Sequence, residues 1–131
     1  MFFEGRCEEA IEFYCKALGA EVTMLMRFKE MPEPREPGMV TAETENKVMH
    51  ASLRIGGSTV LVSDGRCQAA PSFQGFSLTI TARDEAEADR LFQCAGRGGT
   101  VRMPMAKTFF SPRFGVLADR FGVGWMVLVA S

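Results

Sequence analysis

The sequence of 131 residues has a single histidine, His50. One histidine excludes an H-E-x-x-H zinc helix and any metal site that takes three histidines from one chain. It also excludes a mechanism that needs two imidazoles within one subunit. Any role for an imidazole in this protein therefore falls on His50.

Long apolar segments and an excess of one charge are also lacking. The longest unbroken apolar run, 125–130, is far shorter than the roughly 20 residues of a membrane helix. Glu4 and Arg6 interrupt the apolar start, so the sequence predicts no signal-peptide core. With 15 Lys and Arg against 16 Asp and Glu, the chain has no basic surface for nucleic acid. We expect neither a membrane nor a nucleic-acid partner.

Cysteines are few and none forms a C-x-x-C pair: they are Cys7, Cys15, Cys67 and Cys94. Cys7 and Cys15 fall on one predicted helix, about 12 Å apart along its axis, which is too far for a disulfide. Reduced thiols that pack as small apolar groups are typical of a cytoplasmic protein. We therefore expect a cytoplasmic protein without disulfides.

The composition is that of one globular domain covering 1–131, with 47% hydrophobic and 24% charged residues. Within it the chain repeats itself. Glu9-Ala10 is followed by Gly19-Ala20-Glu21-Val22, and Glu85-Ala86 is followed by Gly98-Gly99-Thr100-Val101. The offsets of 76 and 79 residues between the matching positions indicate a three-residue insertion in the second copy. The sequence therefore predicts two modules of similar structure.

Each copy predicts a helix that ends at a glycine in the left-handed conformation. Apolar residues recur on one helix face in both copies. In the first copy they are Ala10, Phe13, Tyr14, Ala17 and Leu18, and in the second Ala88, Leu91, Phe92 and Ala95. Asp84 stands where an N-cap of the second helix is expected.

Strands are predicted on both sides of each helix. In the first copy they are Met1–Phe3, Val22–Phe28, Val48–Ile55 and Ser58–Ser63, and in the second Phe76–Thr81, Thr100–Met103, Ser111–Leu117 and Trp125–Val129. Gly56-Gly57 and Asp119–Gly122 predict tight hairpin turns, and a proline-rich loop (31–38) interrupts the first copy. The fold class is therefore α+β: a βαβββ module over 1–64, a linker over 65–72 and a second βαβββ module over 73–131.

The alternation along the strands predicts which faces pack on the helices. In Val48–Ile55 the odd positions are apolar, whereas His50, Ser52 and Arg54 point the other way. Ser77 and Thr79 likewise alternate with apolar neighbours, and Trp125 shares its face with Val127 and Val129. A sheet face with Ser, Thr and His but few charges suits a semi-polar ligand cavity; the alternative is a plain solvated face.

Several segments together resemble one protein family. They are Phe2–Ala10 with Phe13-Tyr14 and Leu18-Gly19-Ala20, Val48–Ala51, Phe73–Ser77, Thr108–Gly115, Asp119–Gly122 and Trp125-Met126. In this order they resemble the PhnB-like branch of the vicinal oxygen chelate superfamily, over nearly the whole chain. The resemblance implies the paired βαβββ fold of glyoxalase I, bleomycin-resistance proteins and extradiol dioxygenases, with a curved, cup-shaped mixed sheet. It also implies a homodimer whose subunits border the ligand cleft.

Relatives in this branch often carry a 3-demethylubiquinone methyltransferase label. Gly96-Arg97-Gly98-Gly99 follows a predicted helix, whereas a nucleotide-binding glycine loop follows a strand and opens a helix. The sequence therefore does not predict methyl transfer.

Catalytic members of the superfamily hold a divalent metal, and the resemblance locates two of its usual ligand positions. The usual glutamate falls on Met126 and the usual histidine falls near Ser77. A thioether and a hydroxyl are poor substitutes for these ligands. His50 lies outside the usual positions. We therefore predict no metal cofactor; the alternative is a lyase, isomerase or dioxygenase with a divalent metal held around His50.

The function that the sequence favours is binding of a small molecule in the sheet cavity. Arg27, Arg54 and Arg113 are of the type that receives an anionic ligand through forked hydrogen bonds. The aromatic residues beside Arg113 add an apolar wall or pack in the core. The predicted cavity residues are Arg27, His50, Ser52, Ser77, Thr79, Phe110, Arg113 and Met126.

Overall fold

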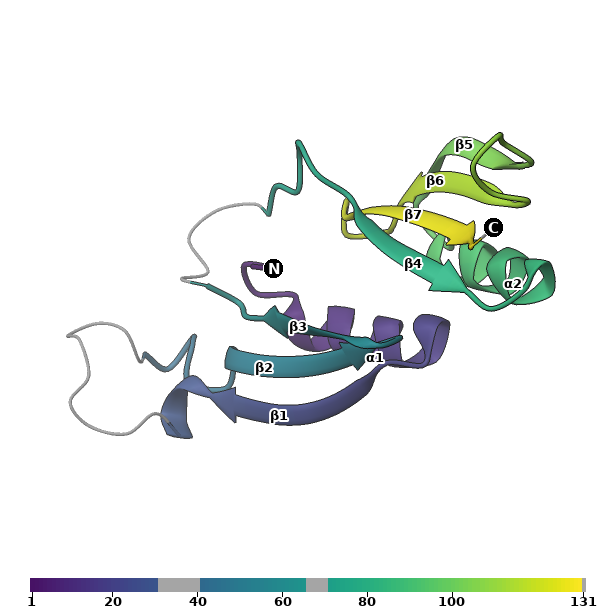
Figure 1. The fold of residues 1–131 in the computed structure, drawn as a ribbon. Coiled ribbons are helices and arrows are strands. Elements are labelled where there is room, and N and C mark those ends of the chain that lie inside the picture. The colour runs from purple at the N-terminus through teal and green to yellow at the C-terminus, as the bar shows by residue number, and fades with distance from the viewer. Residues whose placement is uncertain (31–40, 66–70, 131) are drawn as a thin grey trace. The chain divides into compact units, whose positions relative to one another are not determined.

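The computed structural model describes residues 1–30, 41–65 and 71–130 (Figure 1). The chain divides into two compact units, Met1–Pro71 and Ser72–Ser131. Each unit packs one α-helix on one β-sheet, so the predicted α+β class is confirmed. The predicted proline-rich loop at 31–38, Cys67 and most of the predicted linker lie outside the described residues. No helix in the described ranges is long and apolar enough to cross a membrane.

The first unit is an antiparallel sheet with one helix. Its elements are α1 (Cys7–Leu18), β1 (Glu21–Arg27), the short 3-10 helix η1 (Phe28–Glu30), β2 (Val48–Ile55) and β3 (Ser58–Val62). The strand order is β1-β2-β3. The predicted strand Met1–Phe3 is reduced to one parallel bridge between Phe2 and Ser63. The Gly56-Gly57 hairpin is confirmed, since it joins β2 to β3.

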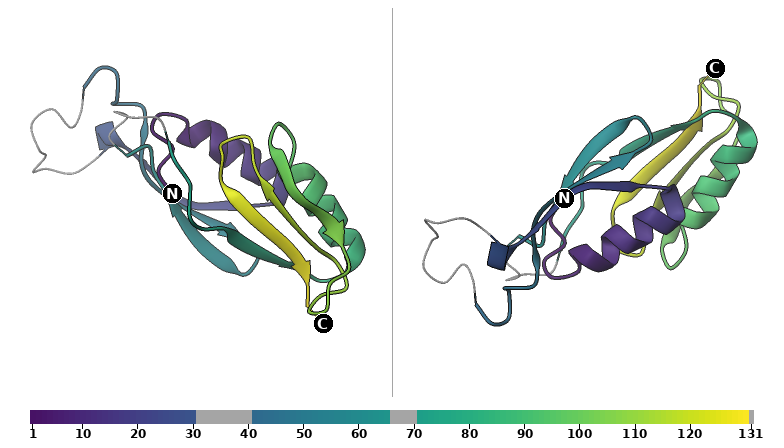
Figure 2. Two further views of the ribbon diagram at one scale, coloured as in Figure 1. Left: turned by 90° about the horizontal axis from the view of Figure 1, so that it is seen from above. Right: turned by 90° about the horizontal axis from the view of Figure 1, so that it is seen from below.

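The second unit is a mixed sheet of four strands with one helix. Its elements are β4 (Leu78–Ala82), α2 (Glu85–Ala95), β5 (Thr100–Ala106), β6 (Phe114–Ala118) and β7 (Gly124–Val129). The order is β4-β7-β6-β5, in which β4 and β7 are parallel and the other pairs antiparallel. Figure 2 shows α2 lying along one side of this sheet.

In the second unit, β4 begins two residues later than predicted, at Leu78, and two further boundaries differ from the prediction for local reasons. β6 begins at Phe114 and not at Ser111, because the buried Ser111 hydroxyl donates to the carbonyl oxygen of Val129 in a turn. β5 continues past Met103 through Pro104. Proline has no backbone N–H, but β5 is an edge strand, where a proline can be accommodated without loss of a hydrogen bond between strands.

The helix ends bear out part of the predicted capping. The Asp84 carboxylate accepts the Glu87 N–H at 2.7 Å, so Asp84 is the predicted N-cap of α2. α1 ends at Gly19 in the left-handed conformation (φ 66°), as predicted. α2 ends at Gly96 in the right-handed conformation, and the left-handed residue follows at Gly98.

The sheet faces turned toward the helices form the cores. Ala51, Leu53 and Ile55 of β2 are buried, which confirms the predicted alternation. Trp125 is buried with Val127 and Val129, as predicted. Val48 is also buried although its position is even, because it lies at the end of β2 against Asp64.

Both units interrupt their edge strand with a bulge at the same place in the repeat. Val22 pairs with Leu53 and Met24 with Ser52, which leaves Thr23 as an extra residue in β1. Val101 pairs with Leu117 and Met103 with Val116, which leaves Arg102 as an extra residue in β5. A bulge of this kind redirects the side chains next to it.

Candidate functional site

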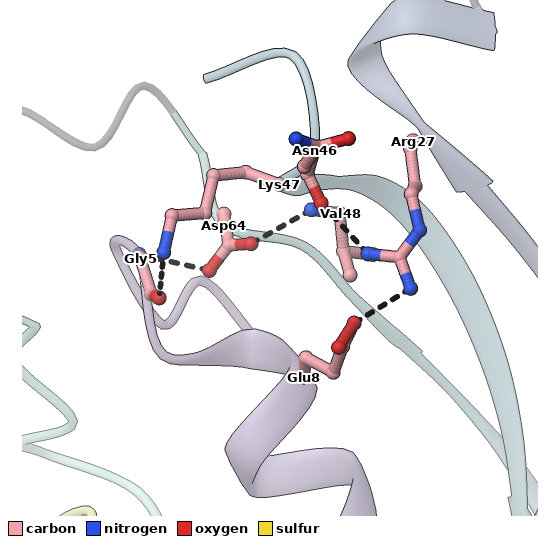
Figure 3. Close-up of a pocket in the computed structure, with 7 residues that line it drawn as sticks. All are labelled: Gly5, Glu8, Arg27, Asn46, Lys47, Val48 and Asp64. Atoms are coloured by element: carbon pink, nitrogen blue, oxygen red, sulfur yellow. Dashed lines mark hydrogen bonds and ion pairs between the residues drawn. The ribbon is translucent and has the colours of Figure 1, made fainter. Parts of the chain in front are cut away.

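A pocket of about 390 Å³ lies in the first unit, beside the start of α1 (Figure 3). Of the predicted cavity residues, this pocket includes Arg27. Its lining residues are Gly5, Glu8, Arg27, Asn46, Lys47, Val48 and Asp64.

The cationic groups of this pocket are bonded within the protein. The Arg27 guanidinium forms an ion pair with Glu8 at 2.6 Å and donates to the Asn46 carbonyl oxygen at 2.7 Å. The Lys47 ammonium donates to the carbonyl oxygen of Gly5 at 2.9 Å. Both groups therefore connect the start of α1 and its neighbouring strands instead of presenting free donors to a ligand.

The Asp64 carboxylate, which lines the same pocket, accepts hydrogen bonds from the backbone. It is 1% exposed and accepts the backbone N–H groups of Gly5, Cys7 and Val48, each at 2.8 Å. Asp64 thus caps the start of α1, where the Arg6 side chain makes no cap. Burial, and then the charge of Asp64, raise the pKa of the Cys7 thiol to about 12. Cys7 is therefore a protonated, inert thiol near neutral pH.

Two predicted residues lie on the face of β2 that points away from the buried Ala51 and Leu53. His50 is half-buried and pairs in register with Met26 of β1. Ser52, also half-buried, stands between Met24 of β1 and Leu61 of β3. Within the described residues, no hydrogen bond engages the His50 imidazole. His50 and Ser52 therefore share a face, as predicted, with methionine and leucine as neighbours.

In the second unit, two further predicted residues lie side by side on the face that points away from α2. Thr79 of β4 pairs in register with Met126 of β7, and Met126 pairs with Val116 of β6. Val116 pairs with Met103 of β5, which is 51% exposed. These residues form one row across the sheet, which we call the helix-free face: Thr79, Met126, Val116 and Met103.

Ser77 borders the helix-free face at Gly124, the first residue of β7. A Cβ atom on Gly124 would lie 2.7 Å from the Ser77 hydroxyl, 3.2 Å from the Phe76 carbonyl oxygen and 3.4 Å from Nη1 of Arg102. Because Gly124 has no side chain, the space between these polar atoms is not filled by a Cβ atom. The sequence prediction included Ser77 but missed Arg102, although the repeat sets Val101-Arg102-Met103 against Val22-Thr23-Met24.

Phe110 and Arg113 lie in the loop between β5 and β6 but have different neighbours. Phe110 is 43% exposed and its ring meets the buried Phe114 ring edge-on at 4.9 Å. Arg113 instead donates to Asp89 of α2 at 2.8 Å. The structure therefore brings Arg113 to the helix side of the sheet and away from Thr79 and Met126.

The described residues do not fit a divalent metal. Nowhere in 1–30, 41–65 and 71–130 do three or more His, Cys, Asp or Glu side chains gather as a ligand set would require. The two usual ligand positions hold Ser77, with the Arg102 cation nearby, and Met126, with Thr79 and Val116 as neighbours. A guanidinium repels a metal cation, and a thioether is a soft, neutral ligand.

The fold defines a class of protein. A glyoxalase/bleomycin resistance protein/dioxygenase from Alicyclobacillus acidocaldarius superposes with a TM-score of 0.53 and 19% identity, covering 94% of this chain and 82% of that one. At this identity the likeness concerns the fold alone. The chain thus has the glyoxalase/bleomycin resistance/dioxygenase fold, as the sequence resemblance implied.

The particular family is shown by closer relatives. The family model described as 3-demethylubiquinone-9 3-methyltransferase matches residues 1–128, and the chain belongs to this family. Protein YjdN of Escherichia coli (strain K12) is 32% identical over 132 residues, which cover 97% of this chain and 90% of YjdN.

Two solved structures support the same assignment. Protein PA1353 from Pseudomonas aeruginosa superposes with a TM-score of 0.83 at 35% identity, over 99% of this chain and 93% of that one. A PhnB protein from Bacillus cereus, described as a putative 3-demethylubiquinone-9 3-methyltransferase, superposes with a TM-score of 0.78 at 29% identity, over 99% and 95%. The predicted membership in the PhnB-like branch is confirmed.

Proposed function

We propose that this chain is a small-molecule binding protein of the glyoxalase/bleomycin-resistance type that works without a bound metal. The observation that carries the proposal is the helix-free face, where thioether, isopropyl and hydroxyl groups line up across four strands. Met103 is half exposed there, although it is large and apolar. Exposed apolar surface of this kind is typical of a binding site.

The residue types indicate what kind of ligand this face suits. Methionine side chains are flexible and make favourable contacts with aromatic rings. The Thr79 hydroxyl both donates and accepts hydrogen bonds. A flat, largely apolar molecule with a few polar atoms at its edge would satisfy both groups. The predicted anion contacts through Arg27, Arg54 and Arg113 receive less support, because all three arginines already pair with carboxylates.

Methyl transfer, which the family description names, has no support from the glycine-rich stretch 96–99. This stretch follows α2 and leads into β5. A nucleotide-binding glycine loop has the opposite order, since it leaves a strand and opens a helix whose N-terminus meets the phosphates. The metal-dependent alternative around His50 likewise lacks a ligand set in the described residues.

A homodimer belongs to the same proposal. The sheet of the first unit ends at β1 and β3, and the sheet of the second unit ends at β4 and β5. Pairing of two subunits is a common way to cover such edges. Light scattering at micromolar concentration is expected to give the mass of two chains; a constant mass of one chain would contradict the dimer.

Binding can be tested with the neutral aromatic compound 2-naphthamide, followed by the methyl NMR signals of methionine. We expect shifts at Met103 and Met126, and a Met126→Glu variant that binds about tenfold or more weakly, because the new carboxylate must lose its water. Gln93→Glu, which adds the same charge on the exposed side of α2, is the matched control and should bind normally.

Three results would contradict the proposal. The first is 2-naphthamide binding that Met126→Glu leaves unchanged, and the second is no binding of 2-naphthamide at all. The third is a stoichiometric zinc, nickel or iron ion in the purified protein that His50→Ala removes. This third result would establish the metal-dependent enzyme instead.

A further inference from the structure

Of the nine arginines in the described residues, Arg120 donates to the carbonyl oxygen of Arg97, and the other eight fall into two groups. Five make carboxylate ion pairs: Arg6 with Glu9, Arg27 with Glu8, Arg54 with Glu21, Arg83 with Glu87 and Arg113 with Asp89. Three others, Arg90, Arg97 and Arg102, have no carboxylate partner in the described part of the chain. Arg90 belongs to α2 and Arg97 to the turn after it, whereas Arg102 belongs to the sheet.

The bulge in β5 explains where the Arg102 side chain goes. As the extra residue between Val101 and Met103, Arg102 is released from the strict alternation of the strand. Its guanidinium reaches past β6 to Gly124 of β7, where Nη1 lies 3.4 Å from the position of an added Cβ. The strand between them presents Ala118 opposite Gly124, so two small residues leave the room for this crossing.

The guanidinium lies near polar atoms at Gly124, and no ion pair joins it to a carboxylate among residues 1–30, 41–65 and 71–130. The three heavy atoms nearest to the Cβ position on Gly124 belong to the Ser77 hydroxyl, the Phe76 carbonyl group and the Arg102 guanidinium. None of them is a carboxylate oxygen. A positive charge and a hydroxyl donor therefore converge at one end of the helix-free face, next to Met126 and Thr79.

We propose that Arg102 and Ser77 bind the anionic group of the ligand, which makes that ligand an aromatic or alicyclic carboxylate or another oxyanion of similar size. This inference rests on the proposed function and specifies its ligand class. The guanidinium donates through its planar fork and the Ser77 hydroxyl donates a further hydrogen bond. The apolar body of the ligand then lies along Met126 and Met103.

The test compares 2-naphthoate with 2-naphthamide by calorimetry at neutral pH, because the two probes differ in charge and hardly in shape. The wild-type protein is expected to bind 2-naphthoate about tenfold more tightly. Arg102→Gln should remove this preference and keep the affinity for 2-naphthamide. Arg102→Lys keeps the charge without the fork and should retain part of the preference.

Arg97→Gln is the matched control, since it removes an unpaired arginine of the same unit that lies outside the helix-free face. It should leave the preference for 2-naphthoate intact. A preference that survives Arg102→Gln, or equal binding of both probes by the wild type, would overturn the inference while 2-naphthamide binding still supports the proposed function. Failure of both probes to bind would overturn both proposals.

Discussion

The two units have the same bulge in their edge strand and use it differently. In β1 the extra residue is Thr23, whose hydroxyl donates to the carbonyl oxygen of Ser52 on the neighbouring strand at 3.2 Å. In β5 the extra residue is Arg102, whose guanidinium extends to Gly124 two strands away. In the first unit the residue at the bulge thus forms a hydrogen bond with the adjacent strand. In the second unit the residue at the bulge extends its guanidinium across the sheet.

The residues beyond the bulge explain this difference. In the first unit the register row next to Val22 is Glu21–Arg54–Thr59, in which Glu21 and Arg54 form an ion pair. In the second unit the corresponding row is Thr100–Ala118–Gly124. Long, paired side chains fill the first row, whereas small residues leave the second row open. Small residues next to the shared bulge thus leave room for the Arg102 side chain at the proposed anion site.

The starts of the two helices differ as well. Asp84 caps α2 from the adjacent position in sequence, through one hydrogen bond to the Glu87 N–H. Asp64 caps α1 from the residues that follow β3, and it also holds the Val48 N–H of β2. The cap of α1 therefore joins three parts of the first unit, while the cap of α2 is local.

The largest expected effect on the free energy of unfolding comes from removing the cap of α1, and it should exceed the effect of removing the cap of α2. Asp64→Ala leaves three N–H groups without their acceptor and should lower the free energy of unfolding by about 3 kcal/mol or more. Asp84→Ala removes an exposed cap and should cost about 1 kcal/mol. Urea denaturation of both variants measures the difference, and equal losses would show that Asp64 is no more than a local cap.

A slightly smaller effect is expected at Gly99, which the sequence repeat aligns with Ala20. A Cβ atom on Gly99 would lie 2.1 Å from the carbonyl oxygen of Ala118, and backbone atoms cannot move aside cheaply. Gly99→Ala should therefore lower the free energy of unfolding by about 2 kcal/mol. Gly57→Ala is the control because its Cβ meets open space. If both variants unfolded alike, the close approach of β5 and β6 would be in doubt.

The buried thiol of the first unit gives a pH dependence. Cys7 keeps its proton in the folded protein up to a pKa of about 12, whereas the ordinary value is 9.0. The unfolded chain therefore loses this proton first, and stability falls as the pH rises from 9 toward 12. Cys7→Ala should show a shallower decline in thermal melts between these pH values. An unchanged slope would mean that another group causes the decline.

The smallest effect on the free energy of unfolding is expected for the ion pair between Arg54 and Glu21 in the first unit. Both Arg54 and Glu21 are more than half exposed, so Arg54→Gln should change the free energy of unfolding by less than about 1 kcal/mol. The preference for 2-naphthoate should also remain, in contrast to Arg102→Gln. Loss of the preference in Arg54→Gln would show that anion binding involves the first unit.

Much of the fold follows from local patterns in the sequence. The apolar face of α2, the N-cap at Asp84 and the burial of Trp125 depend on helical spacing and strand alternation, which the sequence displays directly. The repeat and the family motifs correctly predicted two similar modules. Ser77, Thr79 and Met126 were all among the predicted cavity residues, and the pairing of β4 with β7 brings them near one another on the sheet.

Interactions between residues far apart in sequence could not be predicted from local patterns. Asp64 caps α1 because the end of β3 packs against it, and no spacing rule relates these residues. Arg113 reaches Asp89 and Arg27 reaches Glu8, so two predicted ligand arginines turn out to be paired. Arg102 faces Gly124 because strand register and a bulge set its direction. Local patterns in the sequence thus predict the modules and their faces, whereas the packing of distant segments sets which arginines pair with carboxylates.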